Sequence, residues 1–199
     1  MILNELIRPW HVILASASPR RQELLRGLGI EFEIDTRSNT DEKYDPELPK
    51  AQVAEFLSRL KSEGFHRPLT DNELLITADT VVCIDNQVLG KPKDRADAVQ
   101  MLQSLSGRSH TVYTGVTLRT AARIRSFRVG SEVFFREITD EEINYYIDNY
   151  RPYDKAGAYG IQEWIGYATI TRLKGSYFNV MGLPVQRLYD ELTSFLSQR

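Results

Sequence analysis

The feature that constrains the fold most is an apolar run that passes directly into a helical pattern near the N-terminus. Residues 12–15 are apolar, residues 16–18 are small, and Pro19 begins a segment whose leucines recur at helical spacing up to Gly29. Proline suits the first position of a helix because its missing N–H would have had no partner there, and a preceding serine is a good N-cap. The pattern predicts a buried strand followed at once by a helix, the basic unit of an α/β fold.

The same junction has the chemistry of an anion site. Unpaired N–H groups at the start of a helix attract phosphate, and Ser16, Arg20 and Arg21 add a hydroxyl and two fixed charges. The alternative is an ordinary capped helix with two solvated arginines, because the segment lacks the glycine spacing of a P-loop. The residues alone leave both interpretations open.

The rest of the chain combines two kinds of strand pattern with helical segments. Near-continuous apolar runs are typical of parallel strands, whereas alternation of apolar and polar residues is typical of antiparallel strands. Strands are expected over 12–15, 32–34, 74–84, 88–89, 111–118, 124–129 and 132–138. Helices are expected over 19–28, 52–61, 96–105, 139–150 and 184–196, and the acidic segment 36–49 is expected to be a loop. We therefore predict an α/β fold with a mixed twisted sheet, flanking helices and two lobes around a cleft.

Composition and charge exclude several classes of protein. The chain has 199 residues with 25 basic and 27 acidic side chains, a net charge of -2, so it has no electrostatic case for general nucleic-acid binding. A single cysteine, Cys83, excludes an internal disulfide, and its apolar surroundings predict a buried packing residue. No apolar run approaches the roughly 18 residues of a membrane span, and the first residues do not form a signal peptide. We expect a cytoplasmic protein without a membrane partner.

Two further residues are candidates for chemistry. Asp79 places a carboxylate in an otherwise apolar strand, where it either satisfies backbone donors or serves as a metal ligand or general base. Lys91 lies in a proline-fixed turn shortly after that strand, either solvated or in contact with a phosphate.

These residue types suit a metal-assisted nucleotide hydrolase. Mg²⁺ prefers few carboxylates, several waters and phosphate oxygens, and the basic residues can hold phosphates. His11, His66 and His110 have no metal-ligand spacing, and there is no G-x-S-x-G nucleophile elbow. A histidine-based triad is therefore not expected.

Six segments, in this order, resemble the Maf family of nucleoside triphosphate pyrophosphatases. They are 14–25, 78–82, 90–92, 105–107, 154–162 and 175–184. The resemblance spans nearly the whole chain and implies a single Maf-like domain over residues 1–199. It also implies a two-lobed α/β fold similar to that of the inosine triphosphate pyrophosphatases, and hydrolysis of a nucleoside triphosphate at the α-phosphorus to the monophosphate and pyrophosphate.

The resemblance assigns roles to individual residues. It implies that Asp79 is the catalytic acid/base, which either activates the attacking water or ligates a divalent cation, Mg²⁺, Mn²⁺ or Co²⁺. A family acidic residue after the second strand matches Asp41 or Glu42, and the register stays open. The implied phosphate-binding residues are Ser16, Arg20, Arg21, Lys61 and Lys91.

Three positions, Arg20, Thr80 and Gln162, resemble the branch of the family that acts on dTTP and UTP. The amide of Gln162 offers an acceptor and two donors, which suit the O4 and N3–H edge shared by thymine and uracil. The alternatives are a modified or purine nucleotide such as 7-methyl-GTP, or a nucleotide-binding regulator of cell division without significant turnover. By analogy the protein is expected to be a homodimer, to which an exposed helix with Tyr145, Tyr146 and Tyr150 could contribute.

Overall fold

The computed structural model describes residues 2–38 and 40–197, which form a mixed α/β structure. The helices are α1 (Leu3–Ile7), α2 (Pro19–Gly27), α3 (Lys50–Glu63), α4 (Arg95–Leu105), α5 (Asp140–Tyr150), α6 (Trp164–Thr169), α7 (Tyr177–Met181) and α8 (Val185–Ser197), with a 3-10 turn η1 (Ala156–Ala158). The strands are β1 (His11–Leu14), β2 (Glu33–Ile34), β3 (Glu73–Ile84), β4 (Gln87–Leu89), β5 (Ser109–Arg119), β6 (Ile124–Phe135) and β7 (Ile170–Lys174).

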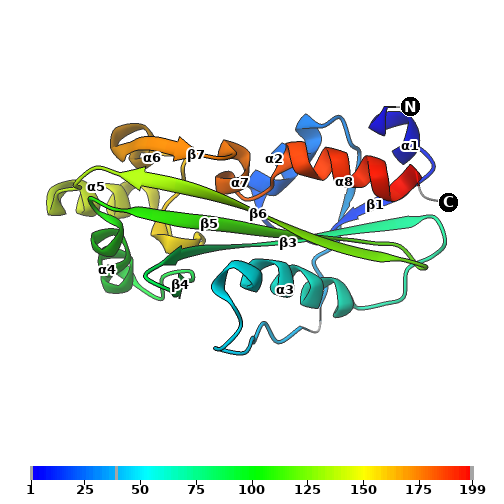
Figure 1. The fold of residues 1–199 in the computed structure, drawn as a ribbon, viewed down its shortest axis with the longest axis horizontal. Helices are drawn as coiled ribbons and strands as arrows, with labels where there is room; N and C mark the ends of the chain where they lie inside the picture. The colour runs from blue at the N-terminus through cyan, green and yellow to red at the C-terminus, as the bar shows by residue number, and fades with distance from the viewer. Residues whose placement is uncertain (1, 39, 198–199) are drawn as a thin grey trace. The chain divides into compact units, whose positions relative to one another are not determined.

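The described strands form a seven-stranded sheet in the order β2-β1-β3-β5-β6-β7, with β4 paired to β3 (Figure 1). The chain divides into two compact units. Unit 1 comprises the described residues within 1–79, 114–129 and 182–199, and unit 2 comprises 80–113 and 130–181. The division falls within β3, β5 and β6, so each of these strands contributes to both units. The expected α/β class with a mixed sheet and flanking helices is confirmed.

Unit 1 is built on the parallel strands that the apolar runs predict. Strand β1 pairs in parallel with β2 and with the first half of β3, with His11 opposite Glu73 and Leu14 opposite Ile76. Figure 1 shows α8 and α3 on opposite sides of these strands, with α1 beside α8. The residues that face this core, among them Ile13 and Leu75, are almost completely buried. Burial of both faces explains why β1 and the first half of β3 lack alternation, whereas both residues of β2 are exposed.

Helix α3 lies close to the sheet because a glycine faces it. A Cβ added at Gly115 of β5 would come within 2.2 Å of the Ala54 carbonyl oxygen, so no larger residue fits without moving backbone. Two hydrogen bonds fasten the same helix: Thr77 Oγ1 donates to the Ser58 carbonyl at 2.6 Å, and Ser58 Oγ lies 2.9 Å from Thr117 Oγ1. The close approach at Gly115 and the two hydrogen bonds together set the distance of α3 from β3 and β5.

Unit 2 shows the turn and cap signals of the sequence directly. Asp85 and Asn86 both have positive φ, 49° and 59°, and join β3 to the antiparallel β4 in a tight turn. Thr139 and Glu142 form the predicted capping box at the start of α5. Helix α4 packs beside α5, where Arg95 donates to Asp148. Strand β7 pairs with β6 in the antiparallel direction.

Several predictions at the level of single residues were wrong. The expected strands 124–129 and 132–138 are one continuous strand, β6, which ends at Phe135. Gly130 does not break this strand, because the missing Cβ makes room for the Tyr113 ring, only 2.8 Å from where it would lie. Ser18 is the N-cap of α2 as predicted, although its hydroxyl makes no capping bond within the described residues. Cys83 is only partly buried.

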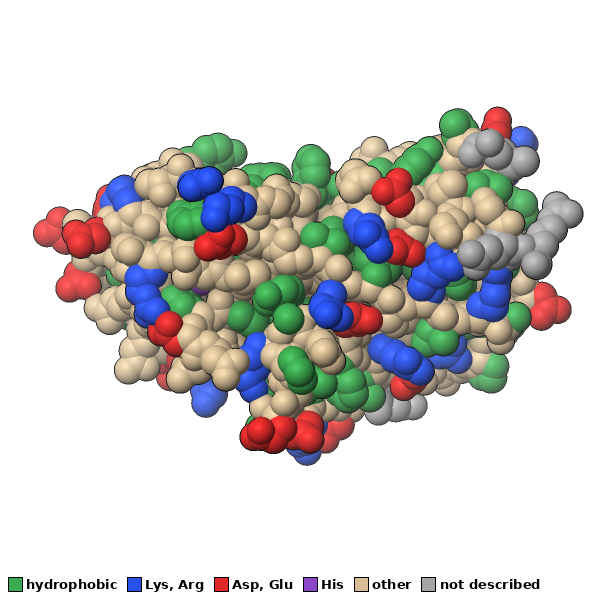
Figure 2. All heavy atoms as spheres, in the orientation of Figure 1, with side chains coloured by type: hydrophobic (Ala, Val, Ile, Leu, Met, Phe, Trp, Pro, Cys, Tyr) green, Lys and Arg blue, Asp and Glu red, His purple; other side chains and the backbone are tan. Residues whose placement is uncertain are grey.

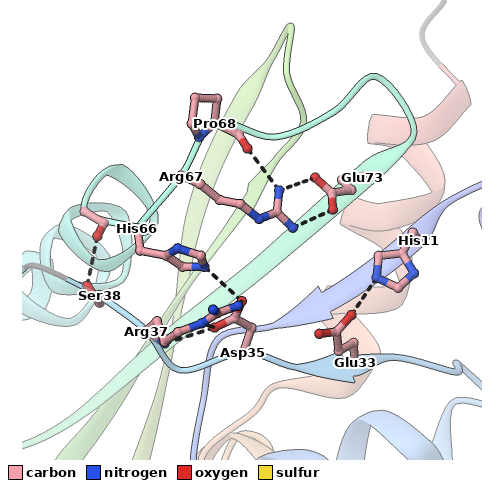
Figure 3. Close-up of polar contacts among 10 residues, drawn as sticks. His11, Glu33, Asp35, Arg37, Ser38, His66, Arg67, Pro68 and Glu73 are labelled. Carbon is pink, nitrogen blue, oxygen red and sulfur yellow. Dashed lines mark hydrogen bonds and ion pairs between the residues drawn. The ribbon is translucent and has the colours of Figure 1, made fainter.

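Two buried carboxylates fasten the loops around the start of β3 (Figure 3). Asp35, just after β2, accepts two hydrogen bonds from the Arg37 guanidinium at 2.9 and 2.7 Å and one from His66 at 3.0 Å. Glu73, the first residue of β3, accepts two from Arg67, both at 2.7 Å. A buried carboxylate is tolerated only when its oxygens are paired in this way. The Arg67 guanidinium lowers the pKa of Glu73 to about 2.

We predict that Gly115→Ala lowers the free energy of unfolding by about 1–3 kcal/mol, because the new methyl group overpacks a helix backbone. Urea denaturation measures this change. The control is Gly27→Ala in α2, where a Cβ would meet nothing within 4 Å and stability should be unchanged or slightly raised. Equal stability of the two variants would contradict the close contact.

We also predict that Glu73→Gln changes how stability depends on pH. Since the folded-state pKa of Glu73 lies below its ordinary value of 4.5, its contribution to stability is present above pH 4.5 and is lost as the pH falls towards about 2. The variant should therefore be less stable at neutral pH and lose less stability on acidification. Glu63→Gln, which removes an exposed pair with Arg59, controls for loss of charge. Denaturant titrations at neutral pH and at about pH 3 measure both effects.

Candidate functional site

The turn between β1 and α2 is organised around Ser16, which is only 7% exposed. Its Oγ accepts hydrogen bonds from the Ser18 backbone N–H at 3.3 Å and from Arg21 Nη1 at 3.4 Å. Gln22 Nε2 donates to the Ser16 carbonyl at 3.4 Å. The hydroxyl that sequence reasoning assigned to phosphate therefore also holds the turn in shape.

Arg21 connects this turn to the neighbourhood of Asp79. Its Nε donates to the Gly182 carbonyl and its Nη1 to the Ala78 carbonyl, both at 2.9 Å. Burial lowers the pKa of Arg21, an effect that the charge of Asp79 opposes and the charge of Arg20 reinforces. Arg21 thus positions the backbone immediately before Asp79 and also brings positive charge to that carboxylate.

Asp79 and Lys61 form the central ion pair of unit 1. Lys61, in the last turn of α3, places its Nζ 2.6 Å from Asp79 Oδ1, and the two side chains are 20% and 14% exposed. A carboxylate in an apolar strand carries a desolvation cost that such a pair offsets. The partner of Asp79 is thus a side chain on α3, 18 residues earlier in the chain.

Glu42, rather than Asp41, reaches this pair. Glu42 Oε2 lies 3.2 Å from Lys61 Nζ, whereas Asp41 pairs with the exposed Lys43 at 2.6 Å. The loop is held on the end of α3 by Thr40 Oγ1, which donates to the Leu60 carbonyl at 3.4 Å. Of the two acidic residues that the sequence left open, Glu42 is therefore the one that lies beside Lys61.

Asp79 and Glu42 supply carboxylate oxygens, the donors that a hard divalent cation prefers. Within the described residues, no three His, Cys, Asp or Glu side chains gather as a ready-made metal site. Asp79 and Glu42 both contact Lys61 and offer only oxygen donors. Mg²⁺ uses one or two carboxylates and takes its other ligands from waters and phosphate oxygens, so two carboxylates are enough for the protein's share of such a site.

The remaining candidates lie in unit 2, except Arg20, which is half-buried in the first turn of α2. Lys91 is exposed, and its turn is fastened by a 3.0 Å hydrogen bond from the Gly157 N–H to the Gly90 carbonyl. Thr80 is half-buried on β3, directly after Asp79. Gln162 lies between η1 and α6.

Gln162 carries an unusual acceptor. Its Oε1 is buried and has no hydrogen-bond partner among the described residues. Buried polar atoms are nearly always paired, so this acceptor is an exception among the candidate residues.

Sequence reasoning missed a second polar cluster, formed by Tyr146, Lys155 and Glu163 in unit 2. Tyr146 was expected on an exposed helix face, but its side chain is 0% exposed and its hydroxyl contacts Glu163. Lys155 is buried and pairs with Glu163 at 3.0 Å. Lys155 lies inside the resembling segment 154–162, the one signal that could have drawn attention to it. His110, which was weighed as part of a loop, lies buried in β5 against Tyr159.

The distribution of surface charge and the apolar character of the helices agree with the near-neutral, moderately apolar composition. On the face shown in Figure 2, basic and acidic side chains are interspersed. None of the helices in the described part of the chain has the length and apolar character needed to cross a membrane.

Comparison with known proteins identifies the family. A sequence model of the Maf family, described as "Maf-like protein", matches residues 11–195. Proteins named dTTP/UTP pyrophosphatase match from Bacteroides thetaiotaomicron (51% identity over 92% of this chain and 95% of that protein) and Porphyromonas gingivalis (50% over 95% and 96%). Another so named, from Flavobacterium johnsoniae, is 45% identical over 98% of this chain and 100% of its own.

A solved HAM1 protein from Coxiella burnetii matches with a TM-score of 0.40 and 17% identity, over 63% of this chain and 73% of its own, which is too distant to add to the assignment. The family match extends through both units and includes every candidate residue named above. The resemblance seen in the sequence motifs is thereby confirmed, and the chain belongs to the Maf family.

Proposed function

We propose that this protein is a nucleoside triphosphate pyrophosphatase that hydrolyses dTTP and UTP to the monophosphate and pyrophosphate. Membership of the Maf family and relatives named dTTP/UTP pyrophosphatase at 45–51% identity support this activity. The observation that carries the proposal is the paired carboxylate of Asp79, with Lys61 and Glu42 beside it. The proposal treats residues 1–199 as one functional domain.

In the proposed reaction a water oxygen attacks the α-phosphorus and the bond from that phosphorus to the bridging oxygen breaks. Pyrophosphate leaves with that oxygen. Asp79 either orients the water and takes its proton or ligates the divalent cation. Lys61, 2.6 Å away, holds the carboxylate in one orientation. The transition state gains negative charge on phosphate oxygens, so fixed positive groups are the main catalytic requirement.

The proposed phosphate-binding residues supply this charge. Arg20 and Arg21 stand at a helix N-terminus, where the backbone dipole also favours an anion. Ser16 adds a hydroxyl, and Lys61 and Lys91 add ammonium groups. Arg21 is already anchored to two carbonyls, which fixes its charge beside Asp79 before any substrate binds.

Asp79 and Glu42 are the residues that would hold a divalent cation, Mg²⁺, Mn²⁺ or Co²⁺, together with oxygens of the triphosphate. When bound, the cation supplies neutralisation of phosphate charge. The oxygen-only donor set supports a hard cation.

Base selection is assigned to Arg20, Thr80 and Gln162. The Gln162 amide, whose Oε1 has no partner among the described residues, can accept the N3–H of uracil or thymine and donate to O4. One methyl group is worth only about 1–3 kcal/mol of discrimination, so we expect dTTP and UTP both to be accepted. Two other expectations from the sequence, that the protein forms a homodimer and that it is cytoplasmic, stay predictions.

We predict that the purified protein with Mg²⁺ or Mn²⁺ releases pyrophosphate from dTTP and UTP, and that Asp79→Asn lowers kcat by about 10²–10⁴-fold while nucleotide binding is retained. An amide of the same size cannot take the proton. Pyrophosphate release and identification of the monophosphate measure the reaction, and calorimetry measures binding.

Asp71→Asn, the same change on an exposed turn in unit 1, is the matched control. Full turnover by Asp79→Asn would remove Asp79 from the mechanism. Activity only on purine or modified nucleotides such as 7-methyl-GTP would overturn the base assignment, and binding without turnover would favour a regulator of cell division.

We further predict that Glu42→Gln lowers kcat at least about tenfold, whereas Asp41→Asn changes it less than about twofold. The reason is that Glu42 contacts Lys61 beside Asp79, while Asp41 pairs with Lys43 and is 71% exposed. Parallel kinetics of the two neighbours test this difference. A larger loss of kcat in Asp41→Asn than in Glu42→Gln would assign the functional role to Asp41 instead.

A further inference from the structure

Tyr146 makes two hydrogen bonds in the interior of unit 2. Its side chain is 0% exposed, although α5 also carries the exposed Tyr145 and Tyr150. The backbone N–H of Gly160 donates to the Tyr146 hydroxyl at 3.0 Å, and that hydroxyl contacts Glu163 Oε2. Because an N–H can only donate, the phenol oxygen is the acceptor in the first bond and its own proton goes to the carboxylate.

The two groups that Tyr146 contacts are the ends of one tight turn. The Glu163 N–H donates to the Gly160 carbonyl at 3.0 Å, so residues 160–163 form a four-residue turn. Gln162 is the third residue of this turn. The Tyr146 hydroxyl therefore connects Gly160 and Glu163, the first and last residues of the turn that contains Gln162.

The Glu163 carboxylate is held from a second direction. Lys155 Nζ lies 3.0 Å from Glu163 Oε1 and 2.7 Å from Asp154 Oδ1, and the Lys155 side chain is 8% exposed. Both oxygens of Glu163 thus have partners. Burial and the neighbouring Glu163 raise the pKa of Tyr146, which keeps the proton on the phenol.

Gln162 lies over the start of the same turn. A Cβ added at Gly160 would stand 2.9 Å from Gln162 Nε2 and 2.9 Å from the Glu163 Cδ, so the glycine makes room for both side chains. The Gln162 Oε1 has no partner among the described residues. The amide is therefore crowded on its nitrogen side, and its oxygen is buried without a partner among the described residues.

Residue type alone does not separate uracil from cytosine at this position. An amide with its oxygen towards N3–H and its NH₂ towards O4 matches uracil or thymine, but the same amide rotated by half a turn matches the N3 acceptor and N4 amino group of cytosine. Discrimination requires that the amide be held in one orientation. A fixed turn beneath it is a means of holding it.

We propose that Tyr146, with Glu163 and Lys155, is a positioning residue that clamps the turn 160–163 so that the Gln162 amide presents one orientation to the pyrimidine edge of the substrate. This inference rests on the proposed pyrophosphatase function and on the role of Gln162 in it. It predicts that the protein prefers uracil to cytosine and that this preference depends on groups outside those touching the nucleotide.

The test compares Tyr146→Phe with wild type, using UTP and CTP as substrates. Phenylalanine keeps the ring but removes both hydrogen bonds of the hydroxyl. We expect the ratio of kcat/KM for UTP over CTP to fall at least about tenfold, because hydrogen-bonded sites discriminate strongly only when donor and acceptor are held in place. The loss should appear mainly as a raised KM for UTP, since the residues around Asp79 are unchanged.

Tyr145→Phe is the matched control. This neighbouring tyrosine is 49% exposed, and its ring packs on Trp164 at 4.9 Å, a contact that phenylalanine keeps. Its UTP-to-CTP ratio should equal that of wild type. Hydrogen–deuterium exchange gives a readout without substrate: the Gly160 N–H should exchange faster in Tyr146→Phe and not in Tyr145→Phe.

Glu163→Gln is the second variant and is informative even if Tyr146→Phe does not fold. It keeps the shape of the side chain, weakens the pair with Lys155 and should lower the ratio by a smaller factor. An unchanged ratio in a folded Tyr146→Phe, or in Glu163→Gln, would overturn the clamp, as would unchanged Gly160 exchange. Failure of the proposed function shows separately, as absence of dTTP and UTP hydrolysis by the wild type.

Discussion

The ion pair of Lys61 with Asp79 joins helix α3 to strand β3 in unit 1 and brings the candidate catalytic carboxylate to the helix end. A carboxylate within an apolar strand is stable only with a partner, and the lysine that supplies it stands on the last turn of α3. Helix α3 must therefore lie close against the sheet, which the absent side chain of Gly115 allows. The same helix end receives the loop of Glu42. The need to pair the Asp79 carboxylate thus links the position of α3, the path of the loop that carries Glu42 and the candidate catalytic group.

The same physical rule recurs elsewhere in the chain. Asp35 and Glu73 are buried because arginine forks occupy their oxygens, and Glu163 in unit 2 is shared between Tyr146 and Lys155. Apolar periodicity sets the helices and strands, whereas these paired charges set the conformations of the segments between them. Some of the candidate functional residues lie on such segments, namely Ser16, Glu42, Lys91 and Gln162, whereas the others lie on α2, α3 and β3.

Local signals predicted the elements that local interactions control. The capping box of Thr139 and the turn at Asp85 follow from short-range hydrogen bonding and backbone preference, and the structure has both. Strand β6 was divided in the prediction because Gly130 resembles a break, yet a ring from the neighbouring strand fills its place. Tyr146 was placed on an exposed face because three tyrosines on one helix look alike until packing distinguishes them.

The sequence by itself determined the α/β class, the order of most elements, the Maf family and the candidate role of Asp79, because these depend on local period and on motifs in a fixed order. Only the tertiary structure decided the partners. Arg21 bonds to Gly182, 161 residues away, and Lys61 to Asp79, 18 residues away. It also distinguished Glu42 from Asp41. Such pairings arise when distant segments pack and bury charge, and no local pattern records which charges will meet.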